Sequence, residues 1–184
     1  MQLNKKGAIF LDRDGVLNIP YILNGKPYAP RKFEKFKLYV NTSEILLMLK
    51  KKGYMLIVVT NQPDISNRLM NSDELKKMNK FLYCTTPIDE IYVCSHSKID
   101  NCSCRKPNPG MMISAISKYN LDKNLCWIVG DRQSDIQAGE ALGIKGIFID
   151  RFYKETNYSL LKVPQVSSLY EAAKIILDGE NNIN

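Results

Sequence analysis

The chain has 184 residues, of which 45% are hydrophobic and 24% are charged, and its formal net charge is +7. This length suffices for one well-buried domain and is short for two, and the composition is ordinary for a soluble globular protein. Because no apolar run is long enough to span a membrane and no targeting signal is evident, we expect a cytoplasmic protein without a membrane partner.

The positive charge does not by itself indicate nucleic acid. Basic residues are scattered over predicted helices and loops, in short runs at 50–52, 76–77 and 105–106. The interleaving of aromatic and basic residues that is typical of a nucleic-acid platform is not evident. A net charge of this sign also suits a small anionic substrate, which is the partner we expect.

Strands and helices alternate along the chain. Short apolar runs bounded by turn residues predict strands over residues 7–12, 54–60, 88–93, 126–129 and 146–149. Helices are predicted over 43–52, 72–82, 109–119, 134–142 and 168–177, with Ser43 capping the first helix and Gly53 ending it. The alternation predicts an α/β fold, with a doubly wound, mostly parallel sheet and helices on both faces. Residues 1–178 would form the single domain and 179–184 a polar C-terminal tail.

Two aspartates one residue apart close the first predicted strand, in Asp12-Arg13-Asp14-Gly15. A buried strand followed by a glycine turn places Asp12 at the strand's carboxyl end, where ligand sites of open α/β sheets lie. Carboxylates crowded there repel each other unless a cation or a shared proton intervenes. The pattern indicates a Mg²⁺ site and a phosphoryl-transfer enzyme with an aspartate nucleophile. An isolated Asp-x-Asp-Gly can also be an ordinary turn after a strand, so the rest of the chain has to decide.

The segment from Asn18 to Tyr39 is predicted to be a long, mixed loop beside this site. Long loops in such positions are often functional. Only this loop and one predicted helix separate Asp12 from Thr60, which leaves no room for a separate cap domain. We therefore expect an open site whose specificity comes from loops, and in which Asp12, Thr60 and Asp131 meet at one edge of the sheet.

Three of the five cysteines and the single histidine of the chain cluster between residues 94 and 104. Four soft or borderline ligands within eleven residues match a tetrahedral Zn²⁺ site, formed by Cys94, His96, Cys102 and Cys104. Because four protein ligands leave no open position, this zinc would be structural and His96 could not serve as a catalytic base. Cys84 and Cys126 are expected to be buried free thiols, as no disulfide framework is expected in a cytosolic chain.

The predicted zinc loop runs directly into Arg105 and Lys106. A clamped loop would hold these two cations with little freedom. Fixed cations near a phosphoryl group stabilise developing charge without reorganisation. An ordinary solvated basic pair is the alternative, and the position beside the metal loop favours the functional interpretation.

Together these elements resemble the haloacid dehalogenase (HAD) superfamily of phosphatases, subclass IIIA. The matching residues stand in the family's order: Asp12-Arg13-Asp14-Gly15, Thr60-Asn61-Gln62, Lys106, and Gly130-Asp131 with Asp135. The zinc loop and residues 104–111 resemble, within the superfamily, the D-glycero-D-manno-heptose 1,7-bisphosphate 7-phosphatases. The resemblance covers residues 7–150 and implies a Rossmann-like HAD fold with a zinc-binding loop and no separate cap domain.

The resemblance also implies a role for each matching residue. Asp12 would be the nucleophile that forms an aspartyl-phosphate, and Asp14 would protonate the leaving sugar oxygen and then activate water. Thr60 and Lys106 would hold the phosphoryl oxygens. Mg²⁺ would be bound by Asp12, by the backbone carbonyl of Asp14 and by Asp131, with Asp135 in support. The residues implied to bind the substrate are Asn61, Gln62, Arg105 and Arg132.

The implied activity is Mg²⁺-dependent removal of the 7-phosphate of D-glycero-D-manno-heptose 1,7-bisphosphate, in the synthesis of nucleotide-activated heptoses for lipopolysaccharide or capsule. A histidinol-phosphate phosphatase, or another sugar phosphatase, is the alternative, because such enzymes resemble the chain in the zinc loop and in residues 130–137. A zinc-stapled binding module without catalysis is a third possibility. We expect a monomer, since the site needs no second chain.

Two segments depart from the family's pattern. The loop after Val16 is a few residues longer than usual, and residues 63–68 replace the usual glycine-bearing stretch after Gln62. Both segments should lie near the sugar part of the substrate, so they leave the chemistry intact and bear on which sugar is bound.

Overall fold

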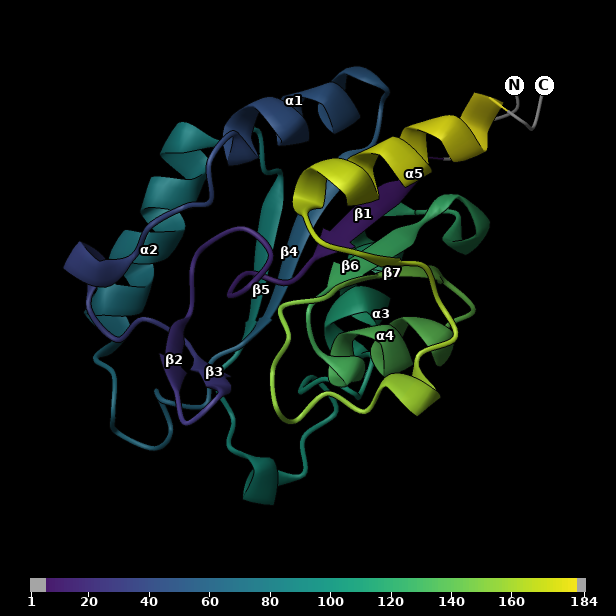
Figure 1. The fold of residues 1–184 in the computed structure, drawn as a ribbon. Helices are drawn as coiled ribbons and strands as arrows, with labels where there is room; N and C mark the ends of the chain where they lie inside the picture. Colours follow the sequence, from purple (N-terminus) through teal and green to yellow (C-terminus); the bar gives the residue numbers. More distant parts are fainter. Residues whose placement is uncertain (1–5, 182–184) are drawn as a thin grey trace.

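The computed structural model describes residues 6–181, and its strands form a six-stranded parallel sheet in the order β5-β4-β1-β6-β7-β8 (Figure 1). The strand bounds are Ala8–Leu11 for β1, Met55–Asn61 for β4, Glu90–Cys94 for β5, Trp127–Gly130 for β6, Lys145–Ile149 for β7 and Gln165–Val166 for β8. Short 3₁₀ turns at Phe33–Lys35, Lys98–Asp100, Lys123–Leu125 and Tyr158–Leu160 lie in the connections.

The order of the strands fixes where the chain reverses direction across the sheet. From β1 the chain moves outward through β4 to β5, and then returns to place β6 on the other side of β1. Leu11 of β1 is in register with Val58 of β4 and with Val129 of β6. Asp12 and Asp131, which follow β1 and β6, therefore emerge beside each other at the topological switch point, where ligands of doubly wound sheets bind.

Helices cover both faces of the sheet, as the sequence predicts (Figure 1). One layer holds α1 (Thr42–Lys51), α2 (Ser72–Thr85) and α5 (Leu169–Asn181), and the other holds α3 (Gly110–Tyr119) and α4 (Gln133–Glu140). Successive residues of a strand point to opposite faces. Accordingly, Ile9 and Leu11 belong to the core beneath α1, α2 and α5, whereas Ala8 and Phe10 belong to the core beneath α3 and α4.

The predicted long loop contains a β-hairpin that the sequence analysis missed. Strands β2 (Tyr21–Leu23) and β3 (Lys26–Tyr28) pair antiparallel around Asn24 and Gly25, which have φ values of 53° and 78°. Positive φ at both central residues is the geometry of a two-residue hairpin turn, and Asn-Gly is its strongest sequence signal. The hairpin is docked by the Lys154 N–H, which donates to the Gly25 carbonyl at 3.1 Å.

Several local predictions need correction. Helix α1 begins at Thr42, one residue earlier than predicted, and its N-cap residue is Asn41 rather than Ser43. Helix α5 continues to Asn181, so the first part of the predicted tail is helical, and residues 182–184 lie outside the described residues. Cys126 is buried as predicted, but Cys84 is exposed on α2. Within residues 6–181, no helix combines the length and apolar character needed to cross a membrane.

Candidate active site and metal centre

Three buried carboxylates and one buried lysine meet where β1 and β6 end. One carboxylate oxygen from each of Asp12, Asp131 and Asp135 lies within 4.8 Å of the others, and all three side chains are buried. The Lys106 ammonium lies 2.8 Å from Asp12 Oδ1 and 2.6 Å from Asp135 Oδ1. It also donates to the Val59 carbonyl at 2.6 Å. One lysine charge cannot balance three carboxylates, so the group is short of positive charge.

This imbalance shows in the pKa values of the group. Burial raises the pKa of Asp12 to about 6, against the opposing effect of Lys106 and with added repulsion from Asp135 and Asp14. Burial, Asp12 and Asp135 likewise raise the pKa of Asp131. Burial would lower the pKa of Lys106, but Asp12 and Asp135 outweigh it and hold that pKa above its ordinary value. The lysine is therefore a fixed cation, while the carboxylates need a further cation to stay ionised.

The donor set fits Mg²⁺. Carboxylate oxygens are the ligands that this ion prefers, and it is typically held by one or two of them. Asp131 Oδ1 is buried and has no hydrogen-bond partner within residues 6–181. A buried polar atom without a partner is costly unless it serves another group. This oxygen, beside Asp12 and Asp135, is thus available to a cation.

The Asp14 carboxylate is not one of the three acids that could share an ion, although it lines the same cavity as Asp12. It accepts hydrogen bonds from Arg13 Nη2 at 3.0 Å, Asn18 Nδ2 at 2.9 Å and Gln62 Nε2 at 2.7 Å. Among the residues predicted to bind Mg²⁺ through a side chain, Asp12 and Asp131 are therefore brought together. Asp135 lies beside them as the third carboxylate, where it also pairs with Lys106 and accepts a hydrogen bond from the Arg132 N–H at the start of α4.

Residues at the end of β4 connect the groups of the site through hydrogen bonds. Gln62 Nε2 donates to Thr60 Oγ1 at 2.9 Å as well as to Asp14, so one amide links two predicted catalytic side chains. Asn61 pairs with the backbone of Lys106, donating to its carbonyl and accepting from its N–H, both at 3.1 Å. Asn61 therefore fixes the residue that carries the buried ammonium.

A cavity of about 740 Å³ opens above these groups, and Asp12, Asp14 and Lys106 form part of its lining. This volume lies within the range of small-molecule sites. All four residues predicted to bind substrate line the cavity: Asn61, Gln62, Arg105 and Arg132. The two segments that depart from the family's pattern line the cavity as well. The first contributes residues 26–29 around β3, and the second contributes Pro63, Asp64 and Asn67.

The stretch after β7 carries contacts that no sequence motif marked. The Tyr153 hydroxyl donates to Asp131 Oδ2 at 2.8 Å. Burial and the neighbouring Asp131 carboxylate raise the pKa of Tyr153, which keeps this hydroxyl protonated. Arg132 donates to Glu155 Oε1 at 3.0 Å and to the Pro27 carbonyl of the hairpin.

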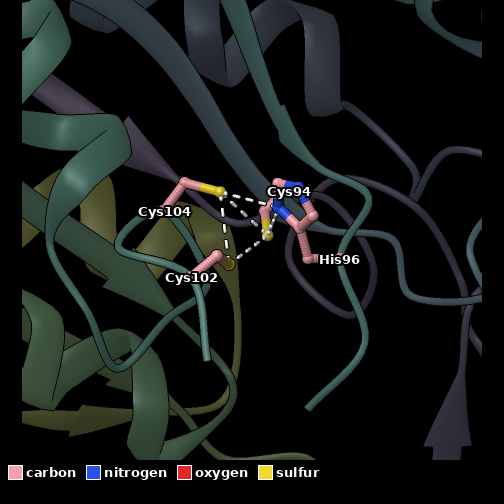
Figure 2. Close-up of side chains that lie close together, drawn as sticks. All are labelled: Cys94, His96, Cys102 and Cys104. Carbon is pink, nitrogen blue, oxygen red and sulfur yellow. Dashed lines mark hydrogen bonds between the residues drawn. The ribbon is translucent and has the colours of Figure 1, made fainter. Parts of the chain in front are cut away.

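The second cluster is the predicted zinc loop, in which four side chains converge on one point (Figure 2). Cys104 Sγ lies 3.2 Å from Cys94 Sγ, 3.5 Å from Cys102 Sγ and 3.2 Å from His96 Nδ1, and Cys94 Sγ lies 3.6 Å from Cys102 Sγ. A tetrahedron with Zn–S bonds of about 2.3 Å has S···S edges of roughly 3.8 Å and slightly shorter S···N edges. The separations are close to these edges, and all three thiols are free.

The buried Cys94 thiol would need a cation to become a thiolate ligand. Burial raises the pKa of Cys94 to about 12, with added effect from its hydrogen bond to Cys104. A thiol coordinated to Zn²⁺ is deprotonated outright, so a cation would reverse this shift. The donors fit Zn²⁺, and four of them leave no open position.

The loop continues from the Cys94–Cys104 cluster to the buried lysine. Arg105 Nη1 donates to the His96 carbonyl at 3.2 Å, and Asn108 Nδ2 donates to the Cys102 carbonyl at 2.8 Å. These contacts fold residues 105–108 back onto the cluster. The predicted link between the cysteine loop and the Arg105-Lys106 pair is thus present in the structure.

Comparisons with known proteins relate the chain to phosphatases. A family model described as HAD-hydrolase-like matches residues 103–151. The D-glycero-beta-D-manno-heptose-1,7-bisphosphate 7-phosphatase of Pasteurella multocida is 31% identical over 92% of this chain and 99% of its own length. The D-glycero-alpha-D-manno-heptose-1,7-bisphosphate 7-phosphatase of Burkholderia mallei is 35% identical over 76% of this chain and 77% of its own. The chain also shares the fold of a solved structure, that of D,D-heptose 1,7-bisphosphate phosphatase from B. bronchiseptica complexed with magnesium and phosphate. The TM-score is 0.79 and the sequence identity 24%, and the match covers 95% of this chain and 99% of the other.

Proposed function

The chain belongs to the HAD-like hydrolases and, within them, to the family of the D-glycero-D-manno-heptose-1,7-bisphosphate 7-phosphatases, and we propose that it removes the 7-phosphate of such a heptose bisphosphate. It is a phosphomonoesterase. The observation that carries the proposal is the group of Asp12, Asp131, Asp135 and Lys106 at the switch point of the sheet, beneath a cavity of sugar-phosphate size.

The first step that we propose is attack by an Asp12 oxygen on the phosphorus of the 7-phosphate. A bond between Asp12 and phosphorus forms, and the bond from phosphorus to the sugar oxygen breaks. Asp14 gives its proton to that oxygen, which leaves as a hydroxyl. Lys106, already fixed by Asn61 and Asp135, would bind the phosphoryl oxygens together with Thr60.

The second step releases inorganic phosphate. Asp14, now ionised, takes a proton from a water molecule, and the water oxygen bonds to phosphorus. The bond between Asp12 and phosphorus breaks, which regenerates the carboxylate. The hydrogen bonds from Arg13 and Gln62 hold the Asp14 side chain at the lining of the cavity, from which it would serve both steps.

We propose that Asp12, Asp131 and the backbone carbonyl of Asp14 hold Mg²⁺, with Asp135 orienting Lys106 beside it. When bound, Mg²⁺ would supply the positive charge that the three buried carboxylates lack and would neutralise charge on the phosphoryl oxygens. The orphaned Asp131 Oδ1 supports this assignment.

We propose that Cys94, His96, Cys102 and Cys104 hold a structural Zn²⁺ and that this clamp fixes Arg105 and Lys106. Substrate binding beyond the reacting phosphate would fall to Asn61, Gln62, Arg105 and Arg132, which line the cavity. We further propose a cytoplasmic monomer that supplies nucleotide-activated heptoses for surface polysaccharide and has no nucleic-acid or membrane partner.

The proposal is tested by incubating the protein with heptose 1,7-bisphosphate and Mg²⁺ and following the phosphorus signals of substrate and products by ³¹P NMR. We expect inorganic phosphate and heptose 1-phosphate, and no release of the 1-phosphate. The variant Asp12→Asn should be inactive although folded, whereas Asp73→Asn, which alters an exposed acid of α2, should keep full activity. Retained activity in Asp12→Asn, or release of the 1-phosphate, would contradict the proposal.

A further inference from the structure

Tyr153 is a buried tyrosine outside every motif of the site. It lies in the stretch that follows β7, and 6% of its surface is exposed. Its hydroxyl donates to Asp131 Oδ2 at 2.8 Å, while Asp131 Oδ1 has no hydrogen-bond partner among the residues that the structure describes. One oxygen of the Asp131 carboxylate, Oδ2, therefore accepts a hydrogen bond, whereas the other, Oδ1, has no such partner among the described residues.

The stretch that carries Tyr153 is itself anchored to the Asp12–Gly15 turn. Arg151 Nε donates to the Gly15 carbonyl at 2.8 Å, and Arg151 Nη1 donates to the Ser167 carbonyl at 3.1 Å. The Arg151 guanidinium also stacks over the Tyr39 ring at 4.2 Å. These contacts hold the Arg151 side chain, two residues before Tyr153, against the Asp12–Gly15 turn, so the stretch that carries the hydroxyl is attached beside Asp131.

The turn leaves space for this contact because it has glycine at its end. A Cβ at Gly15 would lie 1.7 Å from Asp131 Oδ2 and 2.9 Å from the Tyr153 hydroxyl, and the φ of Gly15 is +97°. The same glycine thus closes the aspartate turn and makes room for the bond between Tyr153 and Asp131.

We propose that Tyr153 is a positioning residue that holds Asp131 Oδ2 and so directs Asp131 Oδ1 toward the catalytic cation. The inference rests on the proposed function, because it takes Asp131 as a ligand of that cation. Cation-binding carboxylates are commonly oriented by hydrogen bonds from neighbouring side chains, and loss of such a partner typically weakens metal binding about 10- to 100-fold. Tyr153 touches neither substrate nor reacting atoms in this assignment, and acts through Asp131.

The test is direct binding of Mn²⁺, as a spectroscopic substitute for Mg²⁺, to the zinc-loaded full chain, with free Mn²⁺ measured by electron paramagnetic resonance. The variant Tyr153→Phe removes only the hydroxyl. The matched control Tyr158→Phe removes a similar bond in the same stretch, from the Tyr158 hydroxyl to Asp150 Oδ1 at 2.9 Å. Asp12→Asn identifies the Mn²⁺ bound at this site.

We expect the Kd for Mn²⁺ to rise about tenfold in Tyr153→Phe and to stay unchanged in Tyr158→Phe, with equal Tm values for the two variants. The Mg²⁺ concentration for half-maximal phosphate release should rise by the same factor, and activity should recover at saturating Mg²⁺. An unchanged Kd in Tyr153→Phe, in a protein that still hydrolyses heptose bisphosphate, would overturn this inference alone. Failure of the unmodified chain to bind Mn²⁺ would overturn the inference and the proposed function together.

Discussion

Replacing Asp12 with asparagine should stabilise the Mg²⁺-free protein at neutral pH, even though it abolishes turnover. Asp12 is 6% exposed and lies beside Asp131 and Asp135. Burial raises its pKa from the ordinary 3.8 to about 6, although Lys106 opposes the change. Ionised Asp12 is thus a source of instability that the catalytic cation would remove.

The direction of the pH effect follows from proton binding. Between pH 3.8 and 6, Asp12 in the folded protein holds a proton that the unfolded chain has already released. The stability that Asp12 contributes is therefore fully present below pH 3.8 and is lost as the pH rises through 6. Since each pKa unit corresponds to about 1.4 kcal/mol, the loss is about 3 kcal/mol.

The assay is urea unfolding of zinc-loaded protein in Mg²⁺-free buffer at several pH values between 4 and 7.5. The quantity of interest is the free energy of unfolding of Asp12→Asn minus that of the unmodified chain, because the subtraction removes the titration of the groups that do not interact with Asp12. What remains is the titration of Asp12 together with its effect on Asp131 and Lys106. We expect this difference to rise by about 3 kcal/mol from pH 4 to 7.5, and to shrink when Mg²⁺ is added. The exposed control Asp73→Asn should show no such rise. A flat difference for Asp12→Asn, or a variant less stable than the parent at neutral pH, would refute the reasoning.

Three further substitutions test other parts of the site. Cys102→Ser should reduce bound zinc from about one per chain to a small fraction and lower the Tm, because metal-binding energy is partly folding energy. Bound zinc is measured by elemental analysis, and an unchanged zinc content would count against the four-ligand site. Lys106→Met should lower kcat about 100- to 1000-fold and destabilise the Mg²⁺-free protein by about 3–5 kcal/mol, since it leaves buried carboxylates without their cation. Steady-state kinetics and urea unfolding measure the two effects. An unchanged kcat would show that the lysine is not used in the reaction. Gly15→Ala and Gly53→Ala each place an L residue at positive φ, which costs about 1–2 kcal/mol. Gly15→Ala should cost more than Gly53→Ala and should also weaken Mn²⁺ binding, because its Cβ meets the Asp131 carboxylate whereas space at Gly53 is open. Equal Mn²⁺ affinities of the two variants would contradict this.

The sheet and the positions of the acids were predictable because each depends on a short local pattern. Apolar runs such as Ala8–Leu11 are long enough to identify a buried strand, and the polar residue after each run marks the carboxyl edge. Parallel strands then bring Asp12 and Asp131 together without further information. The candidate zinc site is equally local, since Cys94, His96, Cys102 and Cys104 lie within eleven residues.

The remaining features depend on contacts between distant segments. Tyr153 reaches Asp131 only because the stretch after β7 folds back over the Gly15 turn, and no spacing in the sequence encodes that path. The exposure of Cys84 depends on which side of α2 meets the core, where Leu82 is buried instead. The hairpin, by contrast, had a local signal in Asn24-Gly25 that was masked by the mixed composition around it.

The most direct test of the central claim is a side-by-side measurement of kcat/KM for phosphate release in Mg²⁺. The substrates are both anomers of D-glycero-D-manno-heptose 1,7-bisphosphate, fructose 1,6-bisphosphate and histidinol phosphate. We predict that one heptose anomer is hydrolysed with the highest kcat/KM and that its 7-phosphate is the one released. Preferential hydrolysis of histidinol phosphate, or no Mg²⁺-dependent hydrolysis of any of the four, would contradict the assignment.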